Sequence, residues 1–340
     1  MSDSLDRLLS PFLGERLTRA LPKTGSRGDA KSQADVEEAS NLEGGLSFAF
    51  KFIRQDKAAL AGLIIVGLFL GWALVEGIMQ EVATLTKDQA YGWLLLPSDP
   101  LKLNFNNVLT PPSFKNLASL LGTDDNGHSI LSQILYAAPH DATAAILVVG
   151  SAILIGTFVG IPAGYYGGWV DEVLMRLTDA FLAFPFLVLA IAFTIILGNG
   201  FTVVLAVLML IWWPTYARYF RAQTLALRNR GFVEASKLNG VSSWTMMFRH
   251  IFPNAIDPVI AQATLDFGTV IVTYSTLAFL GIGLDVGYPE WGAMTSNGLN
   301  YLQSSAYFAL IPGAVIIIIV VAFTLIGDRL QDLVGGRITY

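Results

Sequence analysis

The sequence predicts an all-α polytopic membrane protein with six transmembrane helices, and three observations support this fold class. Hydrophobic residues make up 54% of the 340 residues and charged residues only 14%, a balance more apolar than that of soluble globular domains. The apolar residues gather in six runs, each close to the roughly 20 helical residues that cross a bilayer. The runs lack the two-residue alternation of membrane β-strands, so the spans are predicted to be helical.

The six runs set the expected organisation of the chain. They cover residues 58–79, 142–166, 177–197, 201–217, 255–284 and 306–326. A cytoplasmic N-terminal tail over 1–57 precedes them, and a cytoplasmic C-terminal tail over 329–340 follows the core of five spans at 142–328. An external segment over 80–141 joins the first two spans, and a cytoplasmic loop over 218–254 joins the fourth and fifth.

The basic residues predict that both ends of the chain lie in the cytoplasm. Of the 21 Lys and Arg residues, 18 fall in the two tails or in the connections after the second and fourth spans. Only Lys87, Lys102 and Lys115 fall on the other side. Because cytoplasmic loops of membrane proteins are enriched in Lys and Arg, we expect a multi-pass protein of the cytoplasmic membrane in this orientation.

Two segments outside the spans leave alternatives open. In the N-terminal tail, Leu5, Leu9 and Leu13 belong to a series of apolar residues at helical spacing. This series predicts either an amphipathic helix on the inner leaflet or a mobile tail with a transient helix. The external segment is too long for a simple connector. It either docks an external partner or forms a structural lid.

Three glycines mark the second span at intervals of four residues: Gly156, Gly160 and Gly164. Small residues at this spacing let a second helix approach the backbone closely. They predict helix packing within a bundle and no particular function. Pro185 and Pro214 are expected to kink the third and fourth spans.

The cytoplasmic loop over 218–254 has the pattern of folded structure. We expect a short helix over 232–238, ended by Asn239 and Gly240, because glycine readily takes the left-handed conformation that follows a helix. A second helix should start at Ser242 or Ser243, whose hydroxyl groups suit an N-cap.

The second helix is predicted to carry an exposed apolar face. Trp244, Met247 and Phe248 are expected on one side of it, and Pro253 is expected to end it. Aromatic and methionine side chains of this kind suit insertion into a groove of another protein.

Residues of this loop resemble a known family. The run Glu234-Ala235-Ser236, the later Gly240 and the run 250–254 (HIFPN) are similar to the EAA loop of binding-protein-dependent ABC importer permeases. Ser236 stands where that motif usually has alanine, and Phe252 where it usually has leucine.

The resemblance extends over residues 120–335, nearly all of the membrane portion. Segments 168–193, 277–284, 289–294 (PEWGAM) and 327–332 (GDRLQD) are similar to the peptide and nickel branch of these permeases. The run 121–127 (LGTDDNG) also fits that branch. His128 and Gln133 replace the arginines usual there, which puts an inherited external contact through this segment in doubt.

The resemblance implies a division of labour among subunits. Two permeases, expected to be a heterodimer of related chains, would enclose a solute pathway. Two ATPase subunits would bind ATP and Mg²⁺ beneath them, so this chain would hold no cofactor and would not be an enzyme. An extracytoplasmic binding protein would deliver the solute, which we expect to be an oligopeptide or dipeptide, with oligosaccharide or nickel as alternatives. No nucleic-acid partner is implied.

In this scheme the cytoplasmic loop couples the ATPase to the spans. The coupling residues implied are Glu234, Ala235, Ser236, Gly240, Trp244, Phe248 and Pro253. Glu234 is expected to accept a hydrogen bond from an ATPase residue or from a loop N–H group. An internal pair with Arg230, four residues away, is the alternative role of its carboxylate.

Asp266 falls near the middle of the fifth predicted span, where a charge is costly and is usually turned to a partner or to water. It either lines the pore or makes a buried hydrogen bond to Gln262, Thr269 or another helix. A secondary transporter with Asp266 as its coupling site, and a scaffold that only anchors partners, are the rival functions.

An enzyme is disfavoured because the sequence has no phosphate-binding loop, no H-E-x-x-H and no G-x-S-x-G motif. The three histidines are widely separated and the chain has no cysteine, so no metal site is expected.

Overall fold

The computed structural model describes residues 56–198, 200–283 and 288–338. Within these ranges the secondary structure is helical and no strand occurs, which confirms the all-α fold class. Five helices are long and apolar enough to cross a membrane. They are α4 (Lys57–Thr86), α5 (Ile130–Tyr166), α8 (Phe201–Leu227), the continuous helix of α10 (Ser243–Thr245), η4 (Met246–Ile251) and α11 (Phe252–Phe279), and α14 (Tyr307–Ile338).

The remaining predicted span, over 177–197, is a broken helix. It consists of α6 (Gly168–Leu182) and α7 (Phe186–Leu197), whose axes differ by 83°. A bend lies at Pro185, where the sequence predicts a kink, and at 83° it divides the predicted span into two separate helices. Pro185 has no N–H group to continue the helical ladder and disfavours helical dihedral angles in the residue before it, so α6 ends ahead of it.

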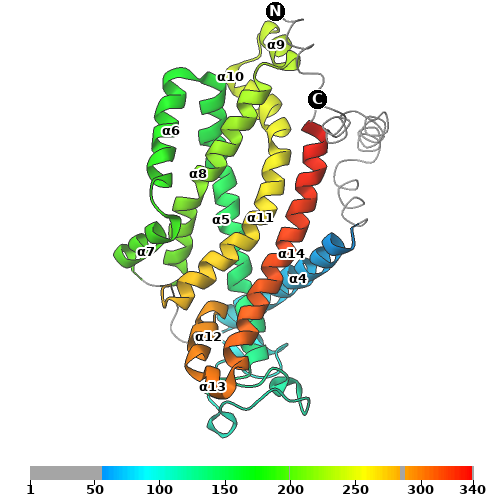
Figure 1. Ribbon diagram of the computed structural model, residues 1–340, viewed down its shortest axis with the longest axis vertical. Coiled ribbons are helices and arrows are strands. Elements are labelled where there is room, and N and C mark those ends of the chain that lie inside the picture. The colour runs from blue at the N-terminus through cyan, green and yellow to red at the C-terminus, as the bar shows by residue number, and fades with distance from the viewer. Residues whose placement is uncertain (1–55, 199, 284–287, 339–340) are drawn as a thin grey trace, which may run out of the picture. The chain divides into compact units, whose positions relative to one another are not determined.

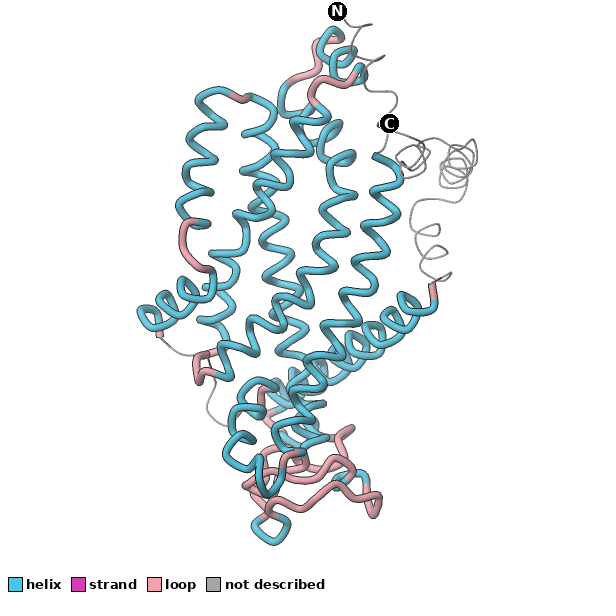
Figure 2. Tube along the Cα trace, viewed as in Figure 1, coloured by secondary structure: helices cyan, strands magenta, loops and turns pink. Residues whose placement is uncertain are grey.

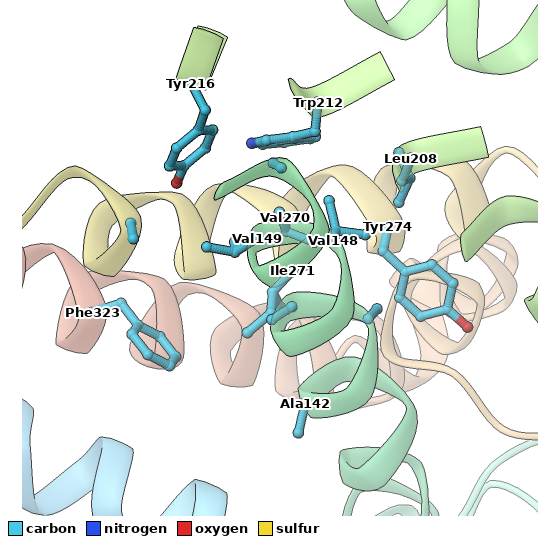
Figure 3. Packing of buried hydrophobic residues seen from close by; sticks show 14 of the residues in the cluster. Ala142, Val148, Val149, Leu208, Trp212, Tyr216, Val270, Ile271, Tyr274 and Phe323 are labelled. Atoms are coloured by element: carbon cyan, nitrogen blue, oxygen red, sulfur yellow. The ribbon is translucent and has the colours of Figure 1, made fainter. Parts of the chain in front are cut away.

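Helices α5 and α8 pack along much of their length, and α11 lies beside both (Figure 1). Val148 and Val149 of α5 lie with Leu208 of α8 and with Val270 and Ile271 of α11 in the buried apolar cluster (Figure 3). This cluster is the core that fixes the relative positions of the three helices.

The three glycines of α5 lie where α8 approaches most closely. A Cβ atom at Gly156 would stand 2.5 Å from the Cβ of Tyr216, and one at Gly164 would stand 2.7 Å from the Cβ of Thr224. A Cβ atom at Gly160 would collide with the carbonyl oxygen of Ala217. Any larger residue at these positions would force the two helices apart.

Most of the irregular segments lie at the two ends of the bundle, and the break between α6 and α7 lies part-way along it (Figure 2). The connection between α4 and α5 lies at one end, with its short 3-10 helices η1 (Gln89–Trp93), η2 (Phe105–Asn107) and η3 (Leu117–Ser119). The short helices α12 (Trp291–Gly298), η5 (Leu299–Tyr301) and α13 (Leu302–Ser305) lie at that same end, and α9 (Gly231–Leu238) lies at the other (Figure 1).

Several predicted boundaries differ from the helices of the structure. Helix α4 continues to Thr86, and α5 begins at Ile130, twelve residues before the predicted start of the second span. Polar residues such as Gln133 and His140 lower the hydropathy of that first part of α5, although it is helical and largely buried. The amphipathic helix considered for the N-terminal tail lies outside the described residues.

Candidate functional site

Helix α9 ends in the way that the sequence predicts. Gly240 takes a φ of +76°, in the left-handed region. The N–H of Val241 donates to the carbonyl of Ser236 at 3.2 Å, and the N–H of Gly240 donates to the carbonyl of Lys237 at 3.0 Å. These two bonds form a Schellman motif, which satisfies carbonyls that the end of a helix leaves free.

The second helix of the loop starts at the predicted cap but does not end where expected. The hydroxyl of Ser242 accepts a hydrogen bond from the N–H of Thr245 at 3.3 Å. The expectation that Pro253 ends the helix is wrong, because the chain continues through the π-helical turn η4 into α11. The wider turn ahead of Pro253 makes room for a residue that lacks a donor and would clash with a regular preceding turn.

Glu234 and Ala235 of α9, together with Trp244 and Phe248 of the next helix, form a surface that we call the α9 face. Glu234 and Ala235 are exposed, and Trp244 keeps 61% of its surface exposed while its ring lies 4.3 Å from that of Phe248. Met247 is only 2% exposed and faces the bundle, so its predicted place on this face is wrong.

The α9 face is anchored to the bundle from beneath. Val233 is fully buried, as is Met246 of the π-helical turn. The ammonium group of Lys237 lies 5.4 Å from the centre of the Tyr165 ring at the end of α5. Among the ion pairs of the described residues, none joins Glu234 to Arg230, so Glu234 presents its carboxylate to the outside.

Three arginines of the predicted cytoplasmic loop donate hydrogen bonds to residues of α5 and α6. Arg221 donates from Nε and Nη2 to the two carboxylate oxygens of Asp171 on α6, at 2.5 and 2.7 Å. Arg218 donates to Asp179 of α6 at 2.7 Å. Arg228 donates to the carbonyl of Gly164, near the C-terminus of α5. These bonds tie α6 and α5 to α8 and fix the base from which the α9 face projects.

Asp266 is buried between α11 and α8, with 8% of its surface exposed. Its carboxylate accepts hydrogen bonds from Gln262 Nε2 at 3.0 Å and from Trp212 Nε1 at 3.4 Å. Trp212 and Tyr216 both project from α8 toward α11 (Figure 3). The hydrogen-bonded role named from the sequence is therefore present, with Gln262 and Trp212 as partners. A pore-lining role for Asp266 stays a prediction.

A second polar site, not found from the sequence, surrounds Pro139 in α5. Pro139 has no N–H group, so the carbonyl of Leu135 lacks its helical donor. The indole of Trp72 on α4 donates to that carbonyl at 2.9 Å, and the indole of Trp291 donates to the carbonyl of Ile134 at 3.0 Å.

The next carbonyl of α5 receives two donors from other elements. Gln80 Nε2 of α4 and the hydroxyl of Tyr288 each donate to the carbonyl of Tyr136 at 2.8 Å. The turn of α5 before Pro139 is thus hydrogen-bonded to α4, to the segment before α12 and to the first residue of α12.

Three acidic side chains are buried in this region: Glu76 of α4, Asp141 of α5, and Glu290, the N-cap residue of α12. Glu290 accepts from the hydroxyl of Ser275 at 3.0 Å and from the N–H of Ala293 at 2.9 Å. Burial raises the pKa of Glu290 to about 7, although these hydrogen bonds oppose the rise.

A signal for these acids was present in the sequence. Glu76 lies inside the first predicted span, where the reasoning applied to Asp266 also applies. Asp141 escaped notice because the predicted second span began one residue after it. Asp141 interacts electrostatically with Glu290, which lies far from it in the sequence, and no local pattern predicts this pairing.

The connection between α4 and α5 is folded around Asp124. Its carboxylate accepts from Nδ1 of His128 at 2.7 Å and from Nε2 of Gln133 at 3.0 Å. His128 and Gln133 therefore bind inside this segment. The hydrogen bond to Asp124 raises the pKa of His128. Beside it lies a polar pocket of about 520 Å³, whose lining includes Asn104 and Asn116.

Residues 152–340 match the family model of the binding-protein-dependent transport system inner membrane component. The chain is 36% identical over 284 residues to the dipeptide transport system permease protein DppC of Alkalihalophilus pseudofirmus, covering 84% of this chain and 87% of that protein. It is 32% identical over 289 residues to the glutathione transport system permease protein GsiD of Pectobacterium atrosepticum, covering 85% of this chain and 89% of that protein.

A solved structure of the MetNI methionine ABC transporter in inward-facing conformations contains a similar chain. The likeness covers 59% of this chain and 96% of that chain, with 18% sequence identity and a TM-score of 0.49.

Proposed function

Because this chain belongs to the family of binding-protein-dependent transport system inner membrane components, we propose that it is the permease subunit of an ABC importer that carries short peptides. Family membership makes it a multi-pass membrane component of a transport system. The peptide class is supported by the dipeptide and glutathione transport named for its relatives, since glutathione is itself a tripeptide.

The observation that carries the coupling role is the α9 face. An exposed carboxylate (Glu234) and an exposed indole (Trp244) project from a base that buried residues and cross-helix arginines hold in place. Tryptophan is enriched among the residues that dominate protein–protein binding energies, and a carboxylate can accept charge-assisted hydrogen bonds from a partner. We infer that an ATPase subunit binds here, and that ATP and Mg²⁺ are held by that partner.

The connection from this face to the spans is continuous. The helix that starts at Ser242 runs without a break through η4 into α11 and ends at Phe279. A displacement of the α9 face would therefore move α11 as a lever, and α8 with it through the contact of Trp212 with Asp266. Rigid-body rocking of this kind would alternate access to the solute pathway.

The proposed orientation places the α9 face in the cytoplasm, as the distribution of Lys and Arg predicts. The polar pocket near Asn104 then faces outward, where an extracytoplasmic binding protein would deliver the peptide. A second, related permease subunit would complete the pathway. Oligosaccharide and nickel are the alternative solutes within the same machinery.

Uptake by proteoliposomes tests the proposal. The chain, reconstituted with its permease and ATPase partners, should accumulate labelled dipeptide only with ATP and binding protein. Glu234→Arg and Gly240→Val should abolish uptake and reduce ATPase co-purification, because the first reverses the presented charge and the second strains a φ of +76°. Ser243→Ala, which changes an exposed residue of the same loop that is not the N-cap, is the matched control.

Two results would contradict the proposal. Uptake that follows a proton or sodium gradient and is lost in Asp266→Ala would favour a secondary transporter. Normal ATP-dependent uptake in Glu234→Arg would remove the coupling role of the α9 face. Competition by an oligosaccharide or by Ni²⁺, with none by dipeptides, would keep the importer but change its solute.

A further inference from the structure

The connection between α4 and α5 contains a polar pocket of about 520 Å³ whose ligand is not yet assigned. Amide and hydroxyl side chains line most of it, and Lys115 supplies the single charge among its described lining residues. No Asp, Glu, His or Cys of the described residues lines it. Binding sites for small molecules commonly have volumes of about 300–1,000 Å³. The pocket therefore has the size of a small-molecule site and favours a polar ligand that is neutral or negatively charged.

Backbone hydrogen bonds hold the walls of the pocket in place. The N–H of Asn104 donates to the carbonyl of Asn126, and the N–H of Thr123 donates to the carbonyl of Thr110, each at 3.0 Å. Gly127, with a φ of +79°, lies so close to Asn104 that a Cβ atom there would collide with the Asn104 carbonyl oxygen. Because these contacts join the two sides of the pocket, it is formed before a ligand arrives, which lowers the entropy cost of binding.

Several side chains of the pocket have no partner within the described chain. The amides of Asn104 and Asn107 and the hydroxyl of Thr110 make no hydrogen bond to the described residues. The ammonium group of Lys115 joins no ion pair among those residues. These groups are not used to hold the fold, and they lie around one pocket. They are therefore available to a ligand.

Asn116 shows which end of its amide is left for a ligand. Its Oδ1 already accepts a hydrogen bond from the N–H of Ser119 at 2.8 Å, so the Nδ2 group is the end that remains to donate. The ammonium group of Lys115, its neighbour in the sequence, can only donate. Two donors, one of them charged, suit a carboxylate, whose two oxygens only accept.

We propose that this pocket is an external binding site for short peptides, in which Lys115 and Asn116 hold the C-terminal carboxylate of the peptide. The ammonium and Nδ2 groups would donate to its two oxygens, and the free amides of Asn104 and Asn107 would bind the peptide backbone. This inference rests on the proposed function for the outward orientation of the pocket and for the peptide class. It adds a site on this chain that binds solute ahead of the transmembrane pathway.

The pocket fits other candidate ligands less well. Ni²⁺ is bound in proteins mainly by imidazole, thiolate and carboxylate groups, and the described lining contains none of these. A neutral oligosaccharide has no group that would use the charge of Lys115. An acidic side chain on a loop of another protein would use that charge, but one side chain fills only part of about 520 Å³. A whole dipeptide uses both the charge and the volume.

Carbodiimide labelling tests the site in the wild-type chain, assembled with its partner subunits in lipid nanodiscs without binding protein. The probe is N-acetyl-Ala-Phe, whose carboxylate is its only charge. The carbodiimide activates this carboxylate, a lysine amine attacks it to form an amide, and the reagent leaves as a urea. Acetate, treated in the same way, gives the intrinsic reactivity of each lysine.

Mass spectrometry of the digested chain locates the label. Lys87 and Lys102 are exposed lysines of the same external segment that lie outside the pocket. We expect the ratio of probe labelling to acetate labelling to be about tenfold higher at Lys115 than at these two, because binding holds the carboxylate beside its amine. Equal ratios at all of these lysines would overturn the proposal. The comparison needs no variant, so it holds even if a variant does not assemble.

Isothermal titration calorimetry of the same assembly measures the contribution of each group. N-acetyl-Ala-Phe should bind Lys115→Gln about tenfold more weakly than the wild type, and Lys102→Gln, the matched control, as tightly as the wild type. N-acetyl-Ala-Phe amide should bind the wild type weakly and lose nothing further in Lys115→Gln, because the variant and the amide remove the same pair. Equal affinities of the two peptides for the wild type would overturn the proposal.

The outcomes separate this proposal from the proposed function. ATP-dependent dipeptide uptake without preferential labelling of Lys115 would overturn the pocket site alone. Preferential labelling of Lys115 in an assembly that transports no peptide would support the pocket site and overturn the proposed function. Cross-linking of Lys115 to an acidic residue of the binding protein, with no labelling by the peptide, would assign the pocket to protein docking and overturn the peptide site.

Discussion

Because α8 packs against one side of α5, we expect alanine to affect stability differently at two glycines of α5, Gly160 and Gly150. In Gly160→Ala, the new Cβ atom would lie 2.8 Å from the Cβ of Phe220 and closer still to the carbonyl oxygen of Ala217. Carbon atoms in favourable contact are about 3.5–4.0 Å apart, so the helices must separate by roughly 1 Å. In Gly150→Ala, the Cβ atom meets no atom within 4 Å.

The magnitude follows from two opposing effects. Replacing glycine by alanine inside a helix favours the helix by about 1 kcal/mol at both positions. Overpacking against a rigid neighbour costs about 1–3 kcal/mol, and this cost applies only to Gly160→Ala. The propensity gain cancels in the comparison, so Gly150→Ala should be about 1–3 kcal/mol more stable than Gly160→Ala.

Unfolding of both purified variants in the same detergent, followed by circular dichroism against temperature or SDS fraction, measures this difference. The wild type should fall at or below Gly150→Ala and above the more disruptive Gly160→Val. Equal stabilities of the two alanine variants, within about 0.5 kcal/mol, would refute the close approach of α5 to α8 at Gly160.

Three further predictions concern single side chains. Ser242→Ala should destabilise the loop by about 1 kcal/mol through loss of its N-cap bond, whereas Ser243→Ala should not, and hydrogen exchange of the loop amides checks the pair. Arg221→Gln should lower the melting temperature by loosening α6 from α8, by an amount corresponding to about 1 kcal/mol because the ion pair is partly exposed. The pKa of His128 is raised by its bond to Asp124, so that stabilisation is complete below about pH 6.5 and is lost as pH rises through the raised value. Melting curves of the wild type and His128→Gln should therefore converge as pH rises, and a constant gap would contradict the assignment.

The coupling loop shows how far local signals reach. A glycine after a short helix and a serine before the next each act through hydrogen bonds to residues within five positions. The sequence therefore assigned Gly240 correctly and limited the N-cap to Ser242 or Ser243, of which the structure has Ser242. The direction of Met247 was wrong, because the π-helical turn η4 rotates the residues that follow Trp244 relative to a regular helix.

The sequence by itself determined the helical class, the apolar spans and the glycines that lie at the closest helix contact, since each depends on local composition and spacing. Tertiary structure decided the rest. Pro185 was predicted to kink a span, but the sequence does not specify that the two segments meet at 83°. Asp266 accepts a hydrogen bond from Trp212 of α8, and Asp141 interacts electrostatically with Glu290 at the start of α12. A buried acid takes its protonation state and its role from groups brought near by folding, and sequence order alone does not specify which groups those are.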